Sequence, residues 1–274
     1  MSVLPVHGER ALEVRAGKWK WLVVADLHIG IEGDYLRKGF KIPDQAPPVL
    51  DRIFKLVEER GPDELILLGD VKHRITMPPA AAGGWVPVAG EHEGRQVARF
   101  LQALSARLPL TVVKGNHDGG LRQMAPLAVS MVSGMKVGDA AFIHGQSWPS
   151  REHMRCRTLV MAHTHPSVLL LDERGRRLLE PCWLRANFRR GPTSEFYKAP
   201  HPELVVMPAF GDLRSGMPVN ERQARLLGPL FKNRLVDLPG ARVHLTNGTY
   251  LGKVRDLEVE GRGHYWRERG GSPH

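Results

Sequence analysis

Residues 21–30 of this chain read WLVVADLHIG, and they begin the pattern that decides the fold. The stretch is apolar from Trp21 to Ala25 and then changes abruptly to Asp26 and His28. Such a short apolar run, bounded by polar residues, predicts a strand that is buried on both faces of a sheet. Because residues i and i+2 of a strand point to the same side, we expect Asp26 and His28 to reach one point at the strand's end.

The same change from apolar to polar residues occurs four more times along the chain. The later runs end in Asp70, in Asn116 followed by His117 and Asp118, in His144, and in the pair His163 and His165. Open α/β sheets collect their ligand sites outside the carboxyl ends of the strands. We therefore expect these side chains to meet in one crevice.

Helical patterns separate the first three strands. Apolar residues recur at helical spacing over residues 47–60, with Asp44 as a cap and Gly61 as the end, and again over residues 96–107. Alternation of strand and helix predicts an α/β fold. The second half contains strand candidates at residues 167–171, 178–183, 204–207 and 248–254, with a hairpin turn over residues 172–175, which indicates a more antiparallel second sheet.

The chain has no obvious boundary between two folding units. We expect a single domain over residues 1–260 and a flexible basic tail over residues 261–274. The Pro- and Ala-rich stretch over residues 77–90 predicts a long loop, which is either an insertion without order or a lid beside the site.

Composition limits the class of protein. The 274 residues are 42% hydrophobic and 25% charged, which is ordinary for a soluble globular protein. No apolar run approaches the roughly 20 residues of a membrane helix, and the first 15 residues lack the layout of a signal peptide. Together with only two cysteines, Cys156 and Cys182, this predicts a cytoplasmic protein without membrane contact. From the length of the chain we expect a monomer or simple homodimer.

The charge balance has two readings. Lys and Arg number 39 against 29 Asp and Glu, a formal net charge of +10. A polyanionic partner such as nucleic acid would explain it. Adaptation to heat or the base composition of the genome, as in a thermophile, would explain it equally well.

The polar residues at the strand ends make a plausible metal-ligand set. Two aspartates, one asparagine and four histidines are too many for one open ion, but they suit two ions with a bridging carboxylate. Oxygen and imidazole ligands without thiolate favour Mn, Fe or Zn over Mg or Ca. A single His after a strand is more often structural, and it is the coincidence of five strand ends that favours metal.

In this order the motifs resemble those of the calcineurin-like metallophosphoesterases, which read D-x-H, G-D-x-x-D/H, G-N-H-D/E, a lone H, and G-H-x-H. The resemblance implies a four-layer α-β-β-α sandwich of two mixed sheets flanked by helices. It also implies that Asp26, His28 and His165 hold one ion, that Asn116, His144 and His163 hold a second, and that Asp70 bridges them. One departure is Ala162, which stands where the last motif usually has glycine.

A narrower resemblance rests on three short stretches: ADLHIG at residues 25–30, LRKG at residues 36–39 and PAF at residues 208–210. They are similar to the archaeal phosphoesterase branch related to the bacterial ligase-associated DNA-repair nucleases. His73 matches a histidine that replaces aspartate in the second motif of a nuclease branch, and it could contact the scissile phosphate. The alternative is a solvated loop histidine.

Two ions about 4 Å apart can share a water and lower its pKa, so that the bridging hydroxide attacks phosphorus. His117 is then our candidate for the general acid at the leaving oxygen, and the resemblance implies that Asp118 orients its ring. The cations of Arg37, Lys38, Lys72 and Arg74 follow the motif strands, where they either clamp phosphate or act as exposed solubilising charges. Further cations that could extend a track for a nucleic-acid backbone are Arg151, Arg155, Arg157, Arg189 and Arg190.

We therefore expect a binuclear phosphodiesterase that acts on DNA or RNA with two divalent ions, most simply Mn, with Fe, Zn, Co or Ni as alternatives. A small-molecule phosphomonoesterase or a nucleotide pyrophosphohydrolase would use the same metal machinery. A binding scaffold that has lost catalysis is a third hypothesis, and the presence of every ligand and of His117 disfavours it.

Overall fold

The computed structural model describes residues 1–75, 89–198, 201–213, 216–222 and 224–259. The predicted tail over residues 261–274 lies outside these ranges. The predicted loop over residues 77–90 also lies outside them, apart from Ala89 and Gly90, which belong to a helix. No helix in the described ranges combines the length and the apolar character that crossing a membrane requires.

The first sheet has six strands in the order β1-β2-β3-β4-β5-β6. Their bounds are β1 Ser2–Pro5, β2 Ala11–Ala16, β3 Trp19–Val24, β4 Glu64–Leu67, β5 Leu110–Val113 and β6 Ser130–Val132. The pairs β1–β2 and β2–β3 are antiparallel, whereas β3, β4, β5 and β6 run parallel. The carboxyl ends of β3, β4 and β5 therefore lie at one edge of the sheet, as the sequence predicted.

Helices α1 (Glu32–Arg37), α2 (Ala46–Arg60) and α3 (Ala89–Ser105) connect these parallel strands. Asp44 Oδ1 accepts a hydrogen bond from the amide of Ala46 at 2.8 Å, and Gly61 ends α2 with a left-handed φ of 56°. The prediction of α2 is confirmed to within one residue. Helix α3 begins seven residues before the predicted start, because the sequence there has no apolar periodicity to mark it.

The second sheet has nine strands, with the main order β13-β10-β11-β12-β9-β8-β7 and with β14 paired to β11 and β15. Their bounds are β7 Met135–Val137, β8 Ala140–Phe142, β9 Thr158–Met161, β10 Pro166–Leu171, β11 Arg177–Ala186, β12 Glu203–Val206, β13 Met217–Pro218, β14 Arg242–Leu245 and β15 Tyr250–Lys253. The predicted turn over residues 172–175 joins β10 and β11 in an antiparallel hairpin. Parallel pairs β8–β9 and β9–β12 make this sheet mixed as well.

Three apolar clusters separate the layers. Inward side chains such as Val23, Ile66 and Val160 pack between the two sheets. The next residues of the same strands, such as Leu22 and Leu65, point the other way and pack against α2 and α3. Full burial of each such side chain stabilises the fold by roughly 1.5–3 kcal/mol.

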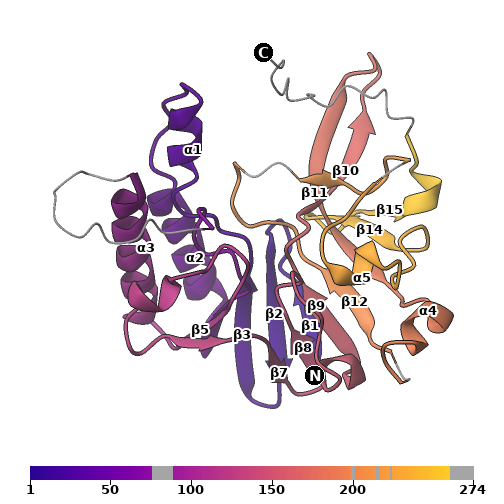
Figure 1. Cartoon of the computed structure of the whole chain (residues 1–274), viewed down its shortest axis with the longest axis horizontal. Coiled ribbons are helices and arrows are strands. Elements are labelled where there is room, and N and C mark those ends of the chain that lie inside the picture. The colour runs from indigo at the N-terminus through magenta and orange to yellow at the C-terminus, as the bar shows by residue number, and fades with distance from the viewer. Residues whose placement is uncertain (76–88, 199–200, 214–215, 223, 260–274) are drawn as a thin grey trace, which may run out of the picture.

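The outer face of the second sheet packs against short helices rather than long ones. Its cluster includes Met154 of the 3-10 turn η2 (His153–Arg155) and Leu230 of α5 (Pro229–Lys232), with Tyr197 just after α4 (Arg190–Ser194). The predicted four-layer sandwich of two mixed sheets is thus confirmed, with a thin fourth layer. In Figure 1, α1 and the β10–β11 hairpin project from the same end of the molecule, one from each half.

Candidate metal centre

All seven predicted ligands follow strand ends. Asp26 and His28 follow β3, Asp70 follows β4, Asn116 follows β5, His144 follows β8, and His163 and His165 follow β9. In the described part of the chain, three groups of three His or Asp side chains have ligand atoms that all lie within 4.8 Å of one another. Two of these groups consist entirely of predicted metal ligands.

The first group joins Asp26, His28 and His165. His28 Nε2 lies 3.4 Å from His165 Nε2, and His165 Nε2 lies 3.3 Å from Asp26 Oδ1. All three side chains are buried. Two ring nitrogens and a carboxylate oxygen therefore face one small volume.

The second group joins Asp70, His144 and His163. Asp70 Oδ1 lies 3.4 Å from His144 Nε2, whereas Asp70 Oδ2 lies 3.8 Å from His28 Nε2 in the first group. One carboxylate thus presents an oxygen to each group. His144 Nδ1 donates to the carbonyl of Leu68 at 3.0 Å, which leaves Nε2 as its ligand atom.

The side chains converge for a different reason from the one the sequence suggested. Asp26 and His28 lie beyond the end of β3 with left-handed φ values of 54° and 50°. Asp70, His163 and His165 are left-handed too, and Arg234 is the one other non-glycine residue with positive φ among the residues described. Strand alternation is therefore the wrong explanation, because each peptide is turned after its strand has ended. Such strain, about 1–3 kcal/mol per residue, typically persists where function requires it.

Two glycines make room for the cluster. A Cβ on Gly69 would lie 2.1 Å from His144 Nδ1, and one on Gly115 would lie 2.2 Å from Asp70 Oδ1. No side chain fits at either distance. Both glycines belong to the matched motifs, so their presence beside Asp70 and Asn116 follows from close packing.

The electrostatic field of the cluster favours positive charge. Burial alone would lower the pKa of His144, but the nearby carboxylates of Asp70 and Asp26 raise that pKa well above the usual value. Burial and the charge of His144 together lower the pKa of His163. The two carboxylates therefore attract a cation to the space between them.

Buried polar atoms support the same conclusion. Asp26 Oδ1, Asn116 Oδ1 and His144 Nε2 are buried without a hydrogen-bond partner. Such atoms destabilise a fold unless something satisfies them. Carboxylate and amide oxygens together with imidazole nitrogens are the donors that divalent transition ions take, so the residues present fit a pair of such ions.

His117 lies at the edge of this centre, and the structure corrects our expectation for its neighbour. His117 Nδ1 donates to the carbonyl of His73, and its Nε2 lies 3.8 Å from Asp70 Oδ2. Asp118 instead accepts from the amide of Gly115 at 2.8 Å and from the amide of Val71 at 2.9 Å. Asp118 therefore ties two ligand loops together, and the His73 carbonyl orients the His117 ring.

The four predicted phosphate contacts have different surroundings. Arg37 is about half exposed and ion-paired with Asp34, and Lys38 is exposed. Lys72, by contrast, is fully buried, with Nζ donating to the carbonyl of Arg74. An exposed Lys72 is thus a wrong expectation; its side chain supports the loop after β4. Arg74 is partly buried beside Glu93, at 4.0 Å.

Two acidic residues that the sequence analysis missed hold His73. Asp34 Oδ2 of α1 lies 2.7 Å from His73 Nε2, and Glu93 Oε1 of α3 accepts from the amides of His73 at 3.0 Å and Arg74 at 2.7 Å. His73 is buried, and its ligand atom lies within 4.8 Å of those of His28 and His117. The expectation of a solvated loop histidine is therefore wrong. The close approach of Glu93 to Gly30 explains that glycine, because a Cβ there would lie 2.4 Å from Glu93 Cγ.

A loop from the second half braces the ligand segment after β3. The amide of Phe210 donates to the carbonyl of Ala25 at 2.8 Å, and a Cβ on Gly211 would lie 2.7 Å from the carbonyl of Leu27. Arg52 of α2 donates to the carbonyl of Phe210 at 3.3 Å and lies over the Phe210 ring at 4.3 Å. The loop therefore connects α2 to the backbone next to Asp26 through hydrogen bonds on both sides of Phe210.

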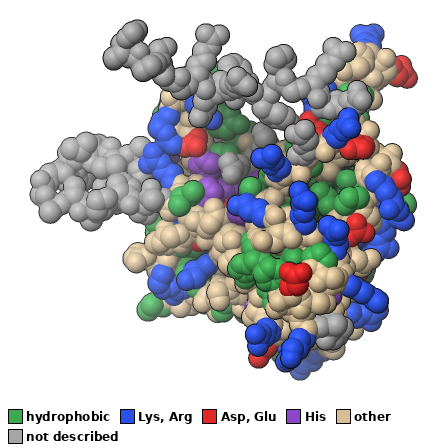
Figure 2. All heavy atoms as spheres, turned by 45° about the vertical axis from the view of Figure 1, so that its right-hand side comes forward, with side chains coloured by type: hydrophobic (Ala, Val, Ile, Leu, Met, Phe, Trp, Pro, Cys, Tyr) green, Lys and Arg blue, Asp and Glu red, His purple; other side chains and the backbone are tan. Residues whose placement is uncertain are grey.

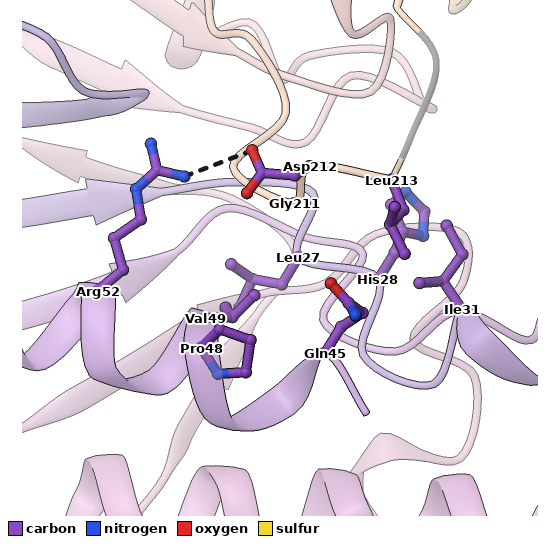
Figure 3. A pocket seen from close by; sticks show the side chains of 10 residues that line it. All are labelled: Leu27, His28, Ile31, Gln45, Pro48, Val49, Arg52, Gly211, Asp212 and Leu213. Atoms are coloured by element: carbon purple, nitrogen blue, oxygen red, sulfur yellow. Dashed lines mark ion pairs between the residues drawn. The ribbon is translucent and has the colours of Figure 1, made fainter. Parts of the chain in front are cut away.

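Figure 3 shows the small cavity, about 50 Å³, that lies between this loop, α2 and His28. Arg52 and Asp212 point toward each other at its rim, at 3.7 Å, and Asp212 also pairs with Arg10 at 2.8 Å. These charges satisfy one another. The cavity thus lies directly beside His28, and the sequence signal for the loop that borders it was only the stretch PAF at residues 208–210.

Comparison with known proteins finds a family model for the part of the chain that carries Asp26 to His144. Residues 20–147 match the family model described as calcineurin-like phosphoesterase. No curated protein matches the chain. Among solved structures, the nuclease MPE of Pseudomonas putida is 21% identical, with 90% of this chain and 98% of that chain covered and a TM-score of 0.48. YfcE, a phosphoesterase from E. coli, is 19% identical, with 56% and 73% covered and a TM-score of 0.32.

Proposed function

Because residues 20–147 match the calcineurin-like phosphoesterase model, we propose that this chain is a metal-dependent hydrolase of that family and that it cleaves phosphodiester bonds of DNA or RNA with two divalent ions.

One observation carries the two-metal part of the proposal. Asp70 presents Oδ2 to the group of Asp26, His28 and His165, and Oδ1 to His144. A carboxylate shared between two ligand groups is the arrangement that a bridged pair of ions requires. We assign Asp26, His28 and His165 to the first ion, Asn116, His144 and His163 to the second, and Asp70 to both.

When bound, two such ions supply Lewis acidity, which lowers the pKa of a shared water and neutralises charge on a phosphoryl group. Manganese suits this donor set, and Fe, Zn, Co and Ni are alternatives. The chain's own residues supply proton transfer and positioning. His117 Nδ1 is fixed as the donor to the His73 carbonyl, so Nε2 is the atom that can hold a proton for the leaving oxygen.

The loops beside the ligands carry cations that suit a polyanionic substrate. Arg37 and Lys38 lie on the exposed end of α1, whose Asp34 contacts His73. The net charge of +10 would raise the rate at which nucleic acid meets the protein. These features favour a polynucleotide over a small phosphomonoester.

A matrix of metals against substrates tests this proposal. Purified protein is loaded with Mn, Fe, Zn, Co or Ni and offered single- and double-stranded DNA, RNA, bis(4-nitrophenyl) phosphate and 4-nitrophenyl phosphate, with Asp70→Ala as the blank. We expect cleavage of the diester and of at least one nucleic acid, and no activity in the blank. Hydrolysis of the monoester alone would refute the nuclease proposal and favour a phosphomonoesterase.

A further inference from the structure

We propose that the exposed rings of Trp148 and Phe196 form a stacking surface for the bases of single-stranded nucleic acid. The inference rests on the proposed function and deepens it by naming the form of the polynucleotide. The two rings are stacked, with centroids 4.8 Å apart and planes inclined by 23°. Each residue is 44% exposed, so an apolar aromatic face remains open to solvent.

The surface is held rigidly. Tyr197, which is buried beside Phe196, donates its hydroxyl to the carbonyl of Pro149, next to Trp148, at 2.8 Å. The amide of Phe196 donates to the carbonyl of Thr193 at 3.1 Å, and Thr193 is fully buried. Because the rings are already ordered, a base that stacks on them has little side-chain entropy to remove.

Charge identifies the partner as a polyanion. In the two segments that carry the rings, residues 148–155 and 189–198, exposed cations outnumber exposed carboxylates. The cations are Arg151, Arg155, Arg189, Arg190 and Lys198, against Glu152 and Glu195. Figure 2 turns the side of α4 toward the viewer and shows Lys and Arg side chains spread over this face. Aromatic rings among cations are the combination that single strands bind, through bases and phosphates respectively.

The surface lies near the metal centre. Trp148 follows His144 by four residues, so their Cα atoms are at most about 14 Å apart. Between them, Gln146 donates to the carbonyl of Lys114 at 3.1 Å, two residues before Asn116. A strand that leaves the metal centre along this loop therefore reaches the rings within a few nucleotides. In a duplex the bases are stacked inside and cannot reach the rings.

The test compares Trp148→Ala and Phe196→Ala with Trp19→Ala as the control. Trp19 is also an exposed tryptophan, 52%, and has the Lys18 ammonium over its ring at 5.5 Å, but it lies at the start of β3. Base stacking removed by alanine should raise the KM for a single-stranded oligonucleotide about 5- to 150-fold. Trp148→Phe should restore part of this loss. Hydrolysis of bis(4-nitrophenyl) phosphate should stay unchanged in all variants.

A binding experiment separates this inference from the proposed function. The binding of a labelled single-stranded oligonucleotide is measured by fluorescence anisotropy in the presence of a chelator, so that no cleavage takes place. Weaker binding by Trp148→Ala than by Trp19→Ala supports the surface even where no nucleic acid is cleaved, an outcome in which only the nuclease proposal fails. The inference would be overturned if Trp148→Ala and Phe196→Ala changed neither oligonucleotide binding nor KM while the protein still cleaved nucleic acid. It would also be overturned if these variants weakened the binding of duplex DNA as much as that of the single strand, or reduced the hydrolysis of bis(4-nitrophenyl) phosphate to the same extent.

Discussion

Replacing Gly69 by alanine tests whether His144 must stand where the structure places it. Gly69 has a φ of 82°, and a Cβ there would lie 2.1 Å from His144 Nδ1. To restore the 3.4 Å of ordinary contact, the imidazole or the backbone must retreat by about 1.3 Å. The hydrogen bond from His144 to the carbonyl of Leu68, 3.0 Å long, would be lost in the process.

A shift of this size exceeds what a metal site tolerates, since bond lengths to a ligand vary by only about 0.2 Å. We therefore expect the Mn concentration for half-maximal activity to rise at least about tenfold, the lower end of what a misplaced ligand orientation does. Any L-residue at this φ also destabilises the fold by about 1–2 kcal/mol. For a chain of this size, that lowers the Tm by about 2–4 °C per kcal/mol.

Gly175→Ala is the matched control. Gly175, in the β10–β11 turn, has a φ of 72°, and an added Cβ there would have nothing within 4 Å. Gly175→Ala therefore introduces the same backbone strain as Gly69→Ala but no contact with His144. Both variants are titrated with Mn in the hydrolysis of bis(4-nitrophenyl) phosphate, and their Tm values are measured. A Gly69→Ala protein that needs no more Mn than Gly175→Ala would refute the reasoning.

Three further outcomes are expected. Arg52→Ala should raise the Mn concentration needed for activity, because it removes the contact that holds the Phe210 loop beside Asp26. The control is Arg107→Ala, which removes a guanidinium 4.7 Å from the ring of Phe54, also on α2, and should leave the Mn requirement unchanged. Equal Mn titrations of the two variants would contradict a role of Arg52 in positioning Asp26. Asp34→Ala should lower kcat about tenfold without changing the Mn requirement, because it removes the contact of Asp34 with His73 Nε2; an unchanged kcat would show that this contact does not serve catalysis. The hydrogen bond from Arg185 lowers the pKa of Glu203, so this carboxylate stabilises the fold above the ordinary glutamate pKa and the contribution is lost as pH falls. Glu203→Gln should therefore lower the Tm at pH 7 and match the parent protein in acid far below the ordinary glutamate pKa, and a difference that persists there would contradict this sign.

The sequence was sufficient for the strands that carry the motifs and for the meeting of the polar side chains that follow them. Apolar runs ending at Ala25, Gly69 and Ala162 mark buried strands, because few other structures bury so many consecutive residues on two faces. Strands β1, β2, β6, β7, β13 and β14 were missed. Most residues of β1, β6, β13 and β14 are only partly covered, so their composition does not distinguish them from loops.

The clustering of these polar side chains was predictable, but the backbone geometry that brings them together was not. Left-handed backbone at Asp26 and His28 is an exception to the preference of L-residues, and it arises from hydrogen bonds to other loops. The amide of His28, for example, donates to the carbonyl of Asp70 at 2.9 Å. Such tertiary contacts override local propensity and leave no periodic signal.

The supporting residues were the least predictable part of the centre. Glu93, Asp34 and Arg52 are charged residues on helices, and their usual place is a solvated face. Their partners lie far along the chain: Arg52 and the carbonyl of Phe210 are 158 residues apart. Lys72 and Asp118 were misjudged for the same reason, because burial of a charged side chain depends on partners that the sequence does not reveal.

Anomalous diffraction from crystals grown with Mn tests the central claim most directly. The account predicts two peaks per chain, one among Asp26, His28 and His165 and the other among Asn116, His144 and His163, both within bonding distance of Asp70. A single peak, or peaks away from the Asp70 carboxylate, would contradict it.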